Sequence, residues 1–403
     1  MSFCKYYKLV RQVSYDSGVT WISLDEFQKG DLYETDSPDC GGGITQYRWV
    51  NVSGEYTCVG TTKYQKTKKQ QSTDGGQTWT DVNPPEYSTG AVIEYNSQAC
   101  GGGGGGYDNQ YLTLVALGSG SFWVSLNYGA TTAQYSKDNG SSWIRLTSSS
   151  TNRSVSSGDR VMFKGLSEVL WGEMPHSPFV NFSGNTQYDV EGNIMSLVYG
   201  DNFIGKTTFP SGFNGSICTF GSDGSDSYNP YLTSIGGLVL PATALTTDCY
   251  ISMFYHCTSI TSVPSGFLPA TTLANVCYAG MFWGCTSLTS VPSDLLPATT
   301  LPEKGCYSYM FAETKITRAP DLPAPILPPY SSNVINDYCY GGMFQDCSRL
   351  NYIKCLATSG MGDYTTKYWL NNVSSSGTFV KASSASWPRG EDGIPNNWTV
   401  QNA

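Results

Sequence analysis

The sequence has little charge, little histidine and no long apolar run. Charged residues make up 14% of its 403 residues, against roughly 25% in typical soluble domains, and 2 residues are histidine. No apolar run approaches the roughly 18 residues that cross a bilayer, so we expect no membrane insertion. The formal net charge of -9 repels phosphate backbones, and no basic cluster is larger than Lys66 to Lys69. We therefore expect no nucleic-acid partner.

The opening residues also lack the apolar stretch of a secretory signal. They read MSFCKYYKLVRQVSYD, and a signal peptide needs an apolar central region. Together with Met1, this favours a protein that does not pass through the secretion channel over one whose signal has been removed.

Residue patterns for catalysis or metal binding are sparse. His176 lies in a proline-rich stretch and His256 at an outward repeat position, and neither has a motif partner, so we expect surface roles. A cysteine nucleophile with a histidine base has no supporting family signature. Asp223 and Asp226 match no calcium-loop spacing and indicate a solvated turn. The sequence predicts no catalytic residue, no metal site and no cofactor.

Cysteines are numerous but do not suggest a disulfide framework. There are 13 of them, an odd number with no Cys-x-x-Cys pair, which favours reduced thiols. Eight fall in C-terminal repeats, where cysteine would act as a small buried apolar group: Cys249, Cys257, Cys277, Cys285, Cys306, Cys339, Cys347 and Cys355.

Glycine and aromatic residues are abundant, with 44 Gly, 28 Tyr and 10 Trp. This composition favours a mainly β protein with short helices. Six consecutive glycines at 101–106 have no side chains to pack, and we interpret them as a linker. It separates an N-terminal β module (1–100) from a small β-sandwich (107–170). Period-two alternation and turn spacing predict strands in that sandwich at 111–117, 121–126, 134–136, 142–146 and 160–164.

One motif, S-x-D-x-G-x-x-W, occurs three times, as SYDSGVTW, STDGGQTW and SKDNGSSW. Each copy predicts a β-hairpin in which Asp accepts turn amides, Gly takes a positive φ and Trp closes over the turn. The pattern resembles the Asp box of sialidases and other β-proteins, which implies a structural role outside any active site. The residues are Asp16, Gly18 and Trp21, then Asp74, Gly76 and Trp79, then Asp138, Gly140 and Trp143.

From residue 238 the chain repeats itself. CYISMFYHCTSITSVP returns as CYAGMFWGCTSLTSVP, and two less regular units follow. Equivalent methionines are 28, 29 and 33 residues apart, a period typical of solenoids: Met253, Met281, Met310 and Met343. We expect a leucine-rich-repeat solenoid over 236–355, with an N-terminal cap at 171–235 and a C-terminal cap at 356–403.

Spacing within a unit predicts a short helix followed by a short strand. Cys277, Met281, Phe282 and Cys285 stand at i, i+4, i+5 and i+8, one face of a helix. One unit cannot bury this face alone, but stacked units share a core. The third unit is one residue shorter and lacks the cysteine of its neighbours, so its turn should be distorted. The predicted core is Met253, Phe254, Met281, Phe282, Met310, Phe311, Met343 and Phe344.

Tyr255 and Trp283 follow Met-Phe in successive units and should point away from the core. Outward aromatic rings can stack on sugar rings, so these two are the candidate ligand-binding residues. The alternative, which we favour, is that they pack on neighbouring coils or in a subunit interface.

The MFxxCxSLTSVP core and the LPATTL lead-in resemble the BspA-like leucine-rich repeats of Bacteroides and its phages. Segments 192–201, 350–358, 377–381 and 393–400 resemble flanking parts of that family, so the likeness covers about 190–403. YRWV, GTTKY and the Asp boxes resemble N-terminal modules found with these repeats in gut Bacteroidetes phages, including crAss-like ones. The resemblance implies surface adhesins or virion fibre and decoration proteins, and it carries over no catalytic residue.

We therefore expect a non-catalytic bacteriophage virion component on the virion surface: a head-fibre, tail-fibre or decoration protein that attaches to the particle and adheres to host-surface or gut glycans. A Bacteroides cell-surface adhesin is the second hypothesis, and a glycan-active enzyme with Asp boxes is the third. Expected partners are other virion proteins, copies of the chain in a homo-oligomer, and host glycans or surface proteins. Residues 1–100 would anchor and oligomerise the protein while 107–403 projects outward, because the module is rich in aromatics suited to pairing: Tyr47, Trp49, Tyr56 and Tyr64.

Overall fold

The computed structural model describes residues 11–13, 22–24, 46–59, 62–73, 77–82, 87–94, 107–126, 133–146, 151–165, 180–221, 228–328, 338–362 and 365–403. The chain divides into two compact units, residues 1–104 and 105–403. The division falls in the glycine run, which lies outside the described residues. Strands predominate, as the sequence predicts, and α1 (Ser196–Tyr199) is the one α-helix in the described part. That part contains no helix long and apolar enough to cross a membrane.

The first unit is built on an antiparallel sheet. β3 (Gln46–Val59) and β4 (Thr62–Ser72) form a long hairpin, and β5 (Thr80–Asp81) and β6 (Tyr87–Glu94) also pair with β4. A separate pair joins β1 (Arg11–Val13) to β2 (Ile22–Leu24). Of the side chains described in this unit, Val82 is the one buried apolar residue.

The second unit begins with two packed sheets. The larger has the strand order β10-β9-β12-β7-β14-β16 and the smaller β11-β8-β13-β15. Rings from facing sheets meet between them, with centroids 4.9 Å apart for Phe163 and Phe182 and 5.3 Å apart for Phe122 and Tyr188. The strands are β7 (Leu112–Ala116), β8 (Gly120–Leu126), β9 (Ala133–Ser136), β10 (Ile144–Arg145), β11 (Thr151–Val155), β12 (Arg160–Gly165), β13 (Val180–Gly184), β14 (Tyr188–Asn193), β15 (Cys218–Thr219) and β16 (Leu232–Val239).

This sandwich is larger than the sequence predicted. Strands β7 to β10 and β12 lie where five strands were expected, but β13 to β16 belong to the same two sheets. β14 lies between β7 and β16, so a boundary at residue 170 would remove a neighbour from β7. The described residues of 171–235 therefore complete the sandwich, and part of them also covers the first coil, since the backbone N–H groups of Ile217 and Phe220 donate to Cys249 and Met253. Parallel pairing of β14 with β16 then leads the chain into the repeats.

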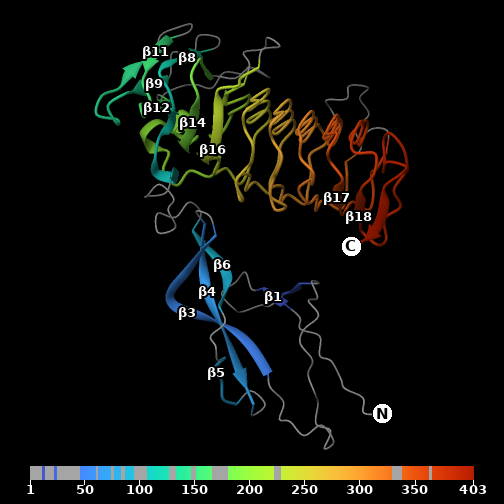
Figure 1. Ribbon diagram of the computed structural model, residues 1–403. Helices are drawn as coiled ribbons and strands as arrows, with labels where there is room; N and C mark the ends of the chain where they lie inside the picture. The colour runs from blue at the N-terminus through green and yellow to red at the C-terminus, as the bar shows by residue number, and fades with distance from the viewer. Residues whose placement is uncertain are drawn as a thin grey trace, which may run out of the picture. The chain divides into compact units, whose positions relative to one another are not determined.

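Beyond β16 the chain winds into coils that lie side by side, coloured yellow to red in Figure 1. Each coil contains a turn segment, and alternate backbone N–H groups of one segment donate to carbonyls of the next. Tyr250 donates to Cys277 at 3.0 Å and Phe254 to Met281 at 2.9 Å. The same pattern joins every successive pair of turn segments, which are 248–257, 276–285, 305–314, 338–347 and 365–373.

The predicted short helices are wrong, because these segments are runs of four-residue turns. The N–H groups of Ile251 and Tyr255 bond three residues back, to Asp248 and Ser252. Every fourth residue is left-handed, with φ of 62° at Asp248, 52° at Ser252 and 57° at His256. A right-handed helix does not accommodate such residues at regular intervals. Each turn instead directs two side chains into the core and two away from it.

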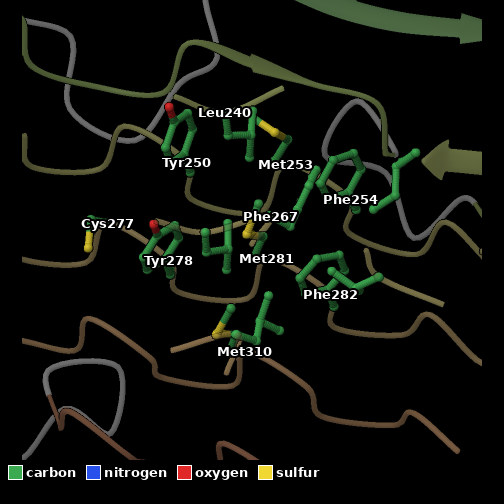
Figure 2. Packing of buried hydrophobic residues seen from close by; sticks show 14 of the residues in the cluster. Leu240, Tyr250, Met253, Phe254, Phe267, Cys277, Tyr278, Met281, Phe282 and Met310 are labelled. Carbon is green, nitrogen blue, oxygen red and sulfur yellow. The ribbon is translucent and has the colours of Figure 1, made fainter. Parts of the chain in front are cut away.

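The inward side chains form columns of like residues. One column contains phenylalanines whose ring centroids are 5.3 to 5.7 Å apart: Phe254, Phe282, Phe311 and Phe344. Another contains tyrosines and ends on a tryptophan: Tyr250, Tyr278, Tyr307, Tyr340 and Trp369. Figure 2 shows methionines of a third column between these two. All eight Met and Phe side chains of the predicted core are 0% exposed.

The shorter third coil differs from its neighbours at one turn. Thr314 stands where the first two coils have Cys257 and Cys285, and it is 2% exposed. Its backbone N–H bonds three residues back, as those of the two cysteines do. At the next turn the Lys315 N–H donates to the Leu288 carbonyl of the neighbouring coil. Thr258 of the first coil likewise donates back, to Asn229, so these hydrogen bonds do not show the expected distortion.

The stack also continues past residue 355, where the sequence predicted its end. Residues 365–373 form a fifth turn segment, and Trp369 stands in the methionine position, 26 residues after Met343. The different residue and the short spacing hide this coil from a search for the repeated motif. A parallel sheet follows, made of β17 (Tyr352–Cys355), β18 (Thr378–Lys381) and β19 (Thr399–Asn402).

Phe282→Ala should lower the free energy of unfolding by about 3–5 kcal/mol. It removes one ring from the phenylalanine column, and the hydrogen-bonded coils on either side resist collapse into the space. Denaturant unfolding followed by circular dichroism measures the loss. Ser290→Ala, at an exposed position of the same coil, is the control and should change stability by no more than about 0.5 kcal/mol. Equal stability of the Phe282 variant and wild type would contradict the packed column.

We expect the repeat cysteines to be reduced. The nine cysteines whose side chains are described are buried free thiols, and burial raises the pKa of Cys277 and Cys347 to about 12, which suppresses the reactive thiolate. The sulfurs of Cys306 and Cys339 are 3.7 Å apart, beyond the roughly 2.05 Å of a disulfide. Iodoacetamide should label the repeat cysteines only after denaturation. Disulfide-linked repeat peptides in mass spectra of the unreduced protein would refute this.

Candidate ligand-binding surface

Tyr255 and Trp283, the two predicted ligand-binding residues, lie on the outward side of the turn segments and are partly exposed. Tyr255 stacks on His256 with centroids 3.9 Å apart, and Trp283 stacks on Tyr309 at 4.7 Å. Tyr255 and Trp283 also meet edge to face at 5.5 Å. Both rings therefore pack on neighbouring side chains. We call Tyr255, His256, Trp283 and Tyr309 the aromatic ridge.

Glycines one coil further along make room for the ridge. A Cβ atom on Gly284 would overlap the imidazole of His256, and one on Gly342 would overlap the ring of Tyr309. Both rings therefore lie against bare backbone. His256 is 7% exposed, because Tyr255 and Tyr228, whose ring centroid is 4.8 Å away, cover it. The surface role expected for His256 is wrong, and its contribution is packing.

Tyr309 also belongs to a groove with a volume of about 520 Å³, within the range of small-molecule sites. Its walls come from the third, fourth and fifth turn segments and from the C-terminal segment. Among the described residues they include three tyrosines, of which Tyr338 is 1% exposed and the other two are partly exposed, together with two amides, one ammonium and one carboxylate. The lining residues are Tyr309, Tyr338, Gln345, Lys367, Tyr368, Asn371 and Glu391.

Two aspartates hold the walls of this groove. Asp346 accepts hydrogen bonds from Gln345 Nε2 at 3.2 Å and from Asn372 Nδ2 at 2.7 Å. Asp392 accepts the backbone N–H of Tyr368 at 3.0 Å. The side-chain amide of Gln345 and the backbone of Tyr368 are thereby fixed before any ligand arrives.

The groove combines opposite charges with neutral donors and acceptors. Lys367 Nζ lies 5.5 Å from the centroid of the Tyr368 ring, and Glu391 supplies an exposed carboxylate. Partial burial raises the pKa of Tyr309, which favours the protonated hydroxyl. Among the described lining residues there is thus one ammonium and one carboxylate, with Asp346 and Asp392 adding carboxylates next to the walls.

Sequence reasoning missed the groove residues because it did not recognise the fifth coil. Tyr309 and Tyr368 occupy equivalent left-handed positions, with φ of 51° and 55°. Glycine occupies that position in the second and fourth coils, at Gly280 and Gly342. An alignment of all five coils would have exposed the two tyrosines as departures from the repeat.

The third Asp box is a hairpin turn between β9 and β10. Asp138 accepts the backbone N–H of Ser142 at 2.9 Å and the hydroxyls of Ser142 and Ser136 at 2.5 and 2.6 Å. Asn139 and Gly140 have φ of 56° and 83°, a backbone that glycine tolerates well. Hydrogen bonds to the ionised carboxylate lower the pKa of Asp138 to about 2. Its oxygens are thus committed to the turn.

Trp143 ties this hairpin to the sandwich. Lys164 Nζ lies 4.3 Å from the centroid of the Trp143 ring, and the Tyr111 ring is 4.9 Å away. Lys164 is 7% exposed and bonds Asp201 at 2.7 and 2.9 Å, while the Tyr111 hydroxyl donates to Asp201 at 2.7 Å. A nearly buried ammonium needs such partners, so this cluster has a structural explanation.

The other candidate residues are mostly outside the described residues. Trp79 is described, and the Arg48 guanidinium lies 4.3 Å from its ring centroid. Among the residues that the structure describes, no group of three or more His, Cys, Asp or Glu side chains could hold a metal ion. The candidates outside the described residues are Asp16, Gly18, Trp21, Asp74, Gly76, His176, Asp223 and Asp226.

The lowered pKa of Asp138 predicts a pH-dependent contribution to stability. Its folded value of about 2 lies below the ordinary 3.8, so the unfolded chain takes up the proton first as pH falls. The contribution is therefore present above about pH 4 and is lost toward pH 2. Asp138→Asn should lower the midpoint of thermal unfolding at pH 7, and the gap to wild type should close near pH 2. Glu303→Gln, at an exposed carboxylate, is the control, and a gap that does not change with pH would contradict the assignment.

Comparison with protein-family models, curated proteins and solved structures finds no match to this chain. The candidate surface is therefore assigned from its own geometry.

Proposed function

We propose that this chain is a non-catalytic structural and adhesion protein of a bacteriophage particle, of the head-fibre, tail-fibre or decoration type. In this proposal the coils form a BspA-like leucine-rich-repeat solenoid that presents a binding surface to host or gut glycans. The repeated MFxxCxSLTSVP core and its resemblance to that family support the proposal.

The observation that carries the proposal is the aromatic ridge and the adjoining groove on a stack of hydrogen-bonded coils. Each coil is held by backbone bonds to its neighbours, so outward side chains keep fixed spacings over several coils. Such stacks offer extended surfaces that suit large or repetitive ligands. Trp283 and Tyr309 show this ordering, since their rings stack across two coils with planes 14° apart.

The first unit suits attachment to partner chains. β3 is 14 residues long and pairs within the described residues only with β4, and a long strand edge can pair with another chain. Trp49 is 49% exposed and Tyr87 is 54% exposed. Val82 is the one buried apolar side chain among those described there, which supports a sheet completed by neighbouring copies or other virion proteins.

A Bacteroides cell-surface adhesin would use the same binding geometry and differ in location. Purified particles of the phage that encodes the chain separate the two hypotheses. Mass spectrometry should find the chain among the structural proteins, and its absence from particles combined with its presence on intact bacterial cells would support the adhesin instead.

We expect the two units to divide the work of attachment and display. Residues 105–403 expressed alone should be folded and monomeric and should fail to join particles, whereas 1–104 should self-associate or bind particles. Analytical ultracentrifugation and co-sedimentation with particles lacking the protein measure these properties. Normal incorporation of 105–403 would place the anchor in the second unit and overturn the division.

A further inference from the structure

We infer that the groove between Tyr309 and Tyr368 binds a short, uncharged glycan. This inference rests on the proposed adhesive function and names the site and the ligand class. The groove combines the two kinds of contact that a sugar ring needs. The partly exposed rings of Tyr309 and Tyr368 offer apolar surface for its C–H groups, and the amides of Gln345 and Asn371 can donate hydrogen bonds to its hydroxyls and accept hydrogen bonds from them.

The lining disfavours other common ligands. Lys367 is the one cation among the described lining residues, and it faces the carboxylates of Glu391 in the lining and of Asp346 and Asp392 beside it, so this lining has no net attraction for phosphate, sulfate or a sialic-acid carboxylate. The seven described lining residues are polar or amphipathic, and none of them is an aliphatic side chain that could receive a lipid tail or an apolar peptide anchor. A neutral polyhydroxylated ring matches this mixture of faces and polar groups best.

The groove is organised in advance, which lowers the entropic cost of binding. The Tyr309 ring stacks on Trp283 at 4.7 Å and lies over the backbone of Gly342. Asp392 holds the backbone of Tyr368, and Asp346 holds the amide of Gln345. Trp283 therefore supports the Tyr309 ring, while the groove makes the ligand contacts.

Binding can be tested on the full-length protein with defined sugars. The probes are lactose, maltotriose and mannotriose as neutral glycans and sialyllactose as the charged one, first immobilised on an array and then titrated by calorimetry. At least one neutral probe should bind. Tyr368→Asn should weaken binding tenfold or more, because it removes a ring while asparagine tolerates the left-handed backbone. Glu391→Gln should change the affinity for the same probe by a few fold.

Two variants separate the groove from other surfaces. Tyr352→Ala removes a partly exposed tyrosine on β17 and should leave affinity unchanged. Tyr255→Ala alters the ridge two coils away from Tyr309 and should also leave it unchanged. Thermal unfolding establishes that each variant is folded.

The alternative outcomes each exclude a part of the inference. Binding of sialyllactose alone would overturn the uncharged ligand class. Loss of neutral-glycan binding in Tyr255→Ala, with Tyr368→Asn and Glu391→Gln unaffected, would move the site to the ridge and leave the adhesive function standing. Failure of every probe to bind a protein that joins particles normally would overturn the glycan site but not the structural role. Absence from particles would overturn the proposed virion function separately.

Discussion

The repeat half of the protein depends on how its backbone N–H groups are shared between coils. In each turn segment these groups alternate, with one bonding the next coil and another bonding three residues back. Buried backbone donors need partners, and a single coil supplies only the second kind. A coil is therefore complete only when another coil lies beside it, so the stack forms as a unit. The same bonds hold equivalent residues of neighbouring coils in register.

That register explains both the core and the ridge. Inward positions meet their own equivalents, which is why phenylalanines stack on phenylalanines, while Trp369 stacks on the last tyrosine from the methionine position of the fifth coil. Substitutions that preserve size fit, as Thr314 does in a cysteine position. At the left-handed outward positions a bulky residue is followed by glycine, so His256 lies over Gly284 and Tyr309 over Gly342, whereas Tyr255 and Trp283 fit one after the other by meeting edge to face. The alignment of equivalent positions in successive coils thus shapes both the core and the outward surface.

Much of this arrangement could be predicted from the sequence, and the errors have physical causes. The offsets between methionines identify buried Met and Phe positions directly, because residues in register repeat at the coil length. The helix prediction failed because a spacing of four fits both an α-helix and a run of four-residue turns. The left-handed positions could not be recognised from residue type, since they include Asp248, Val276 and Glu313 as well as glycines. The sandwich boundary failed because the pairing of β14 with β7 and β16 is a long-range contact that local alternation does not encode.

The candidate site lies where the repeat is least regular, and this follows from the register as well. A perfect repeat would place the same residue at each outward position and produce a uniform surface. Here the left-handed outward position holds Ser252, Gly280, Tyr309, Gly342 and Tyr368 in successive coils. Tyrosines therefore project from the third and fifth coils, while the coil between them carries glycine, and both tyrosines line the groove. A groove of this kind needs side chains of different size at equivalent positions of a regularly repeated backbone. The irregular last coils, which weaken the repeat signal in the sequence, are the part of the stack able to shape a binding site.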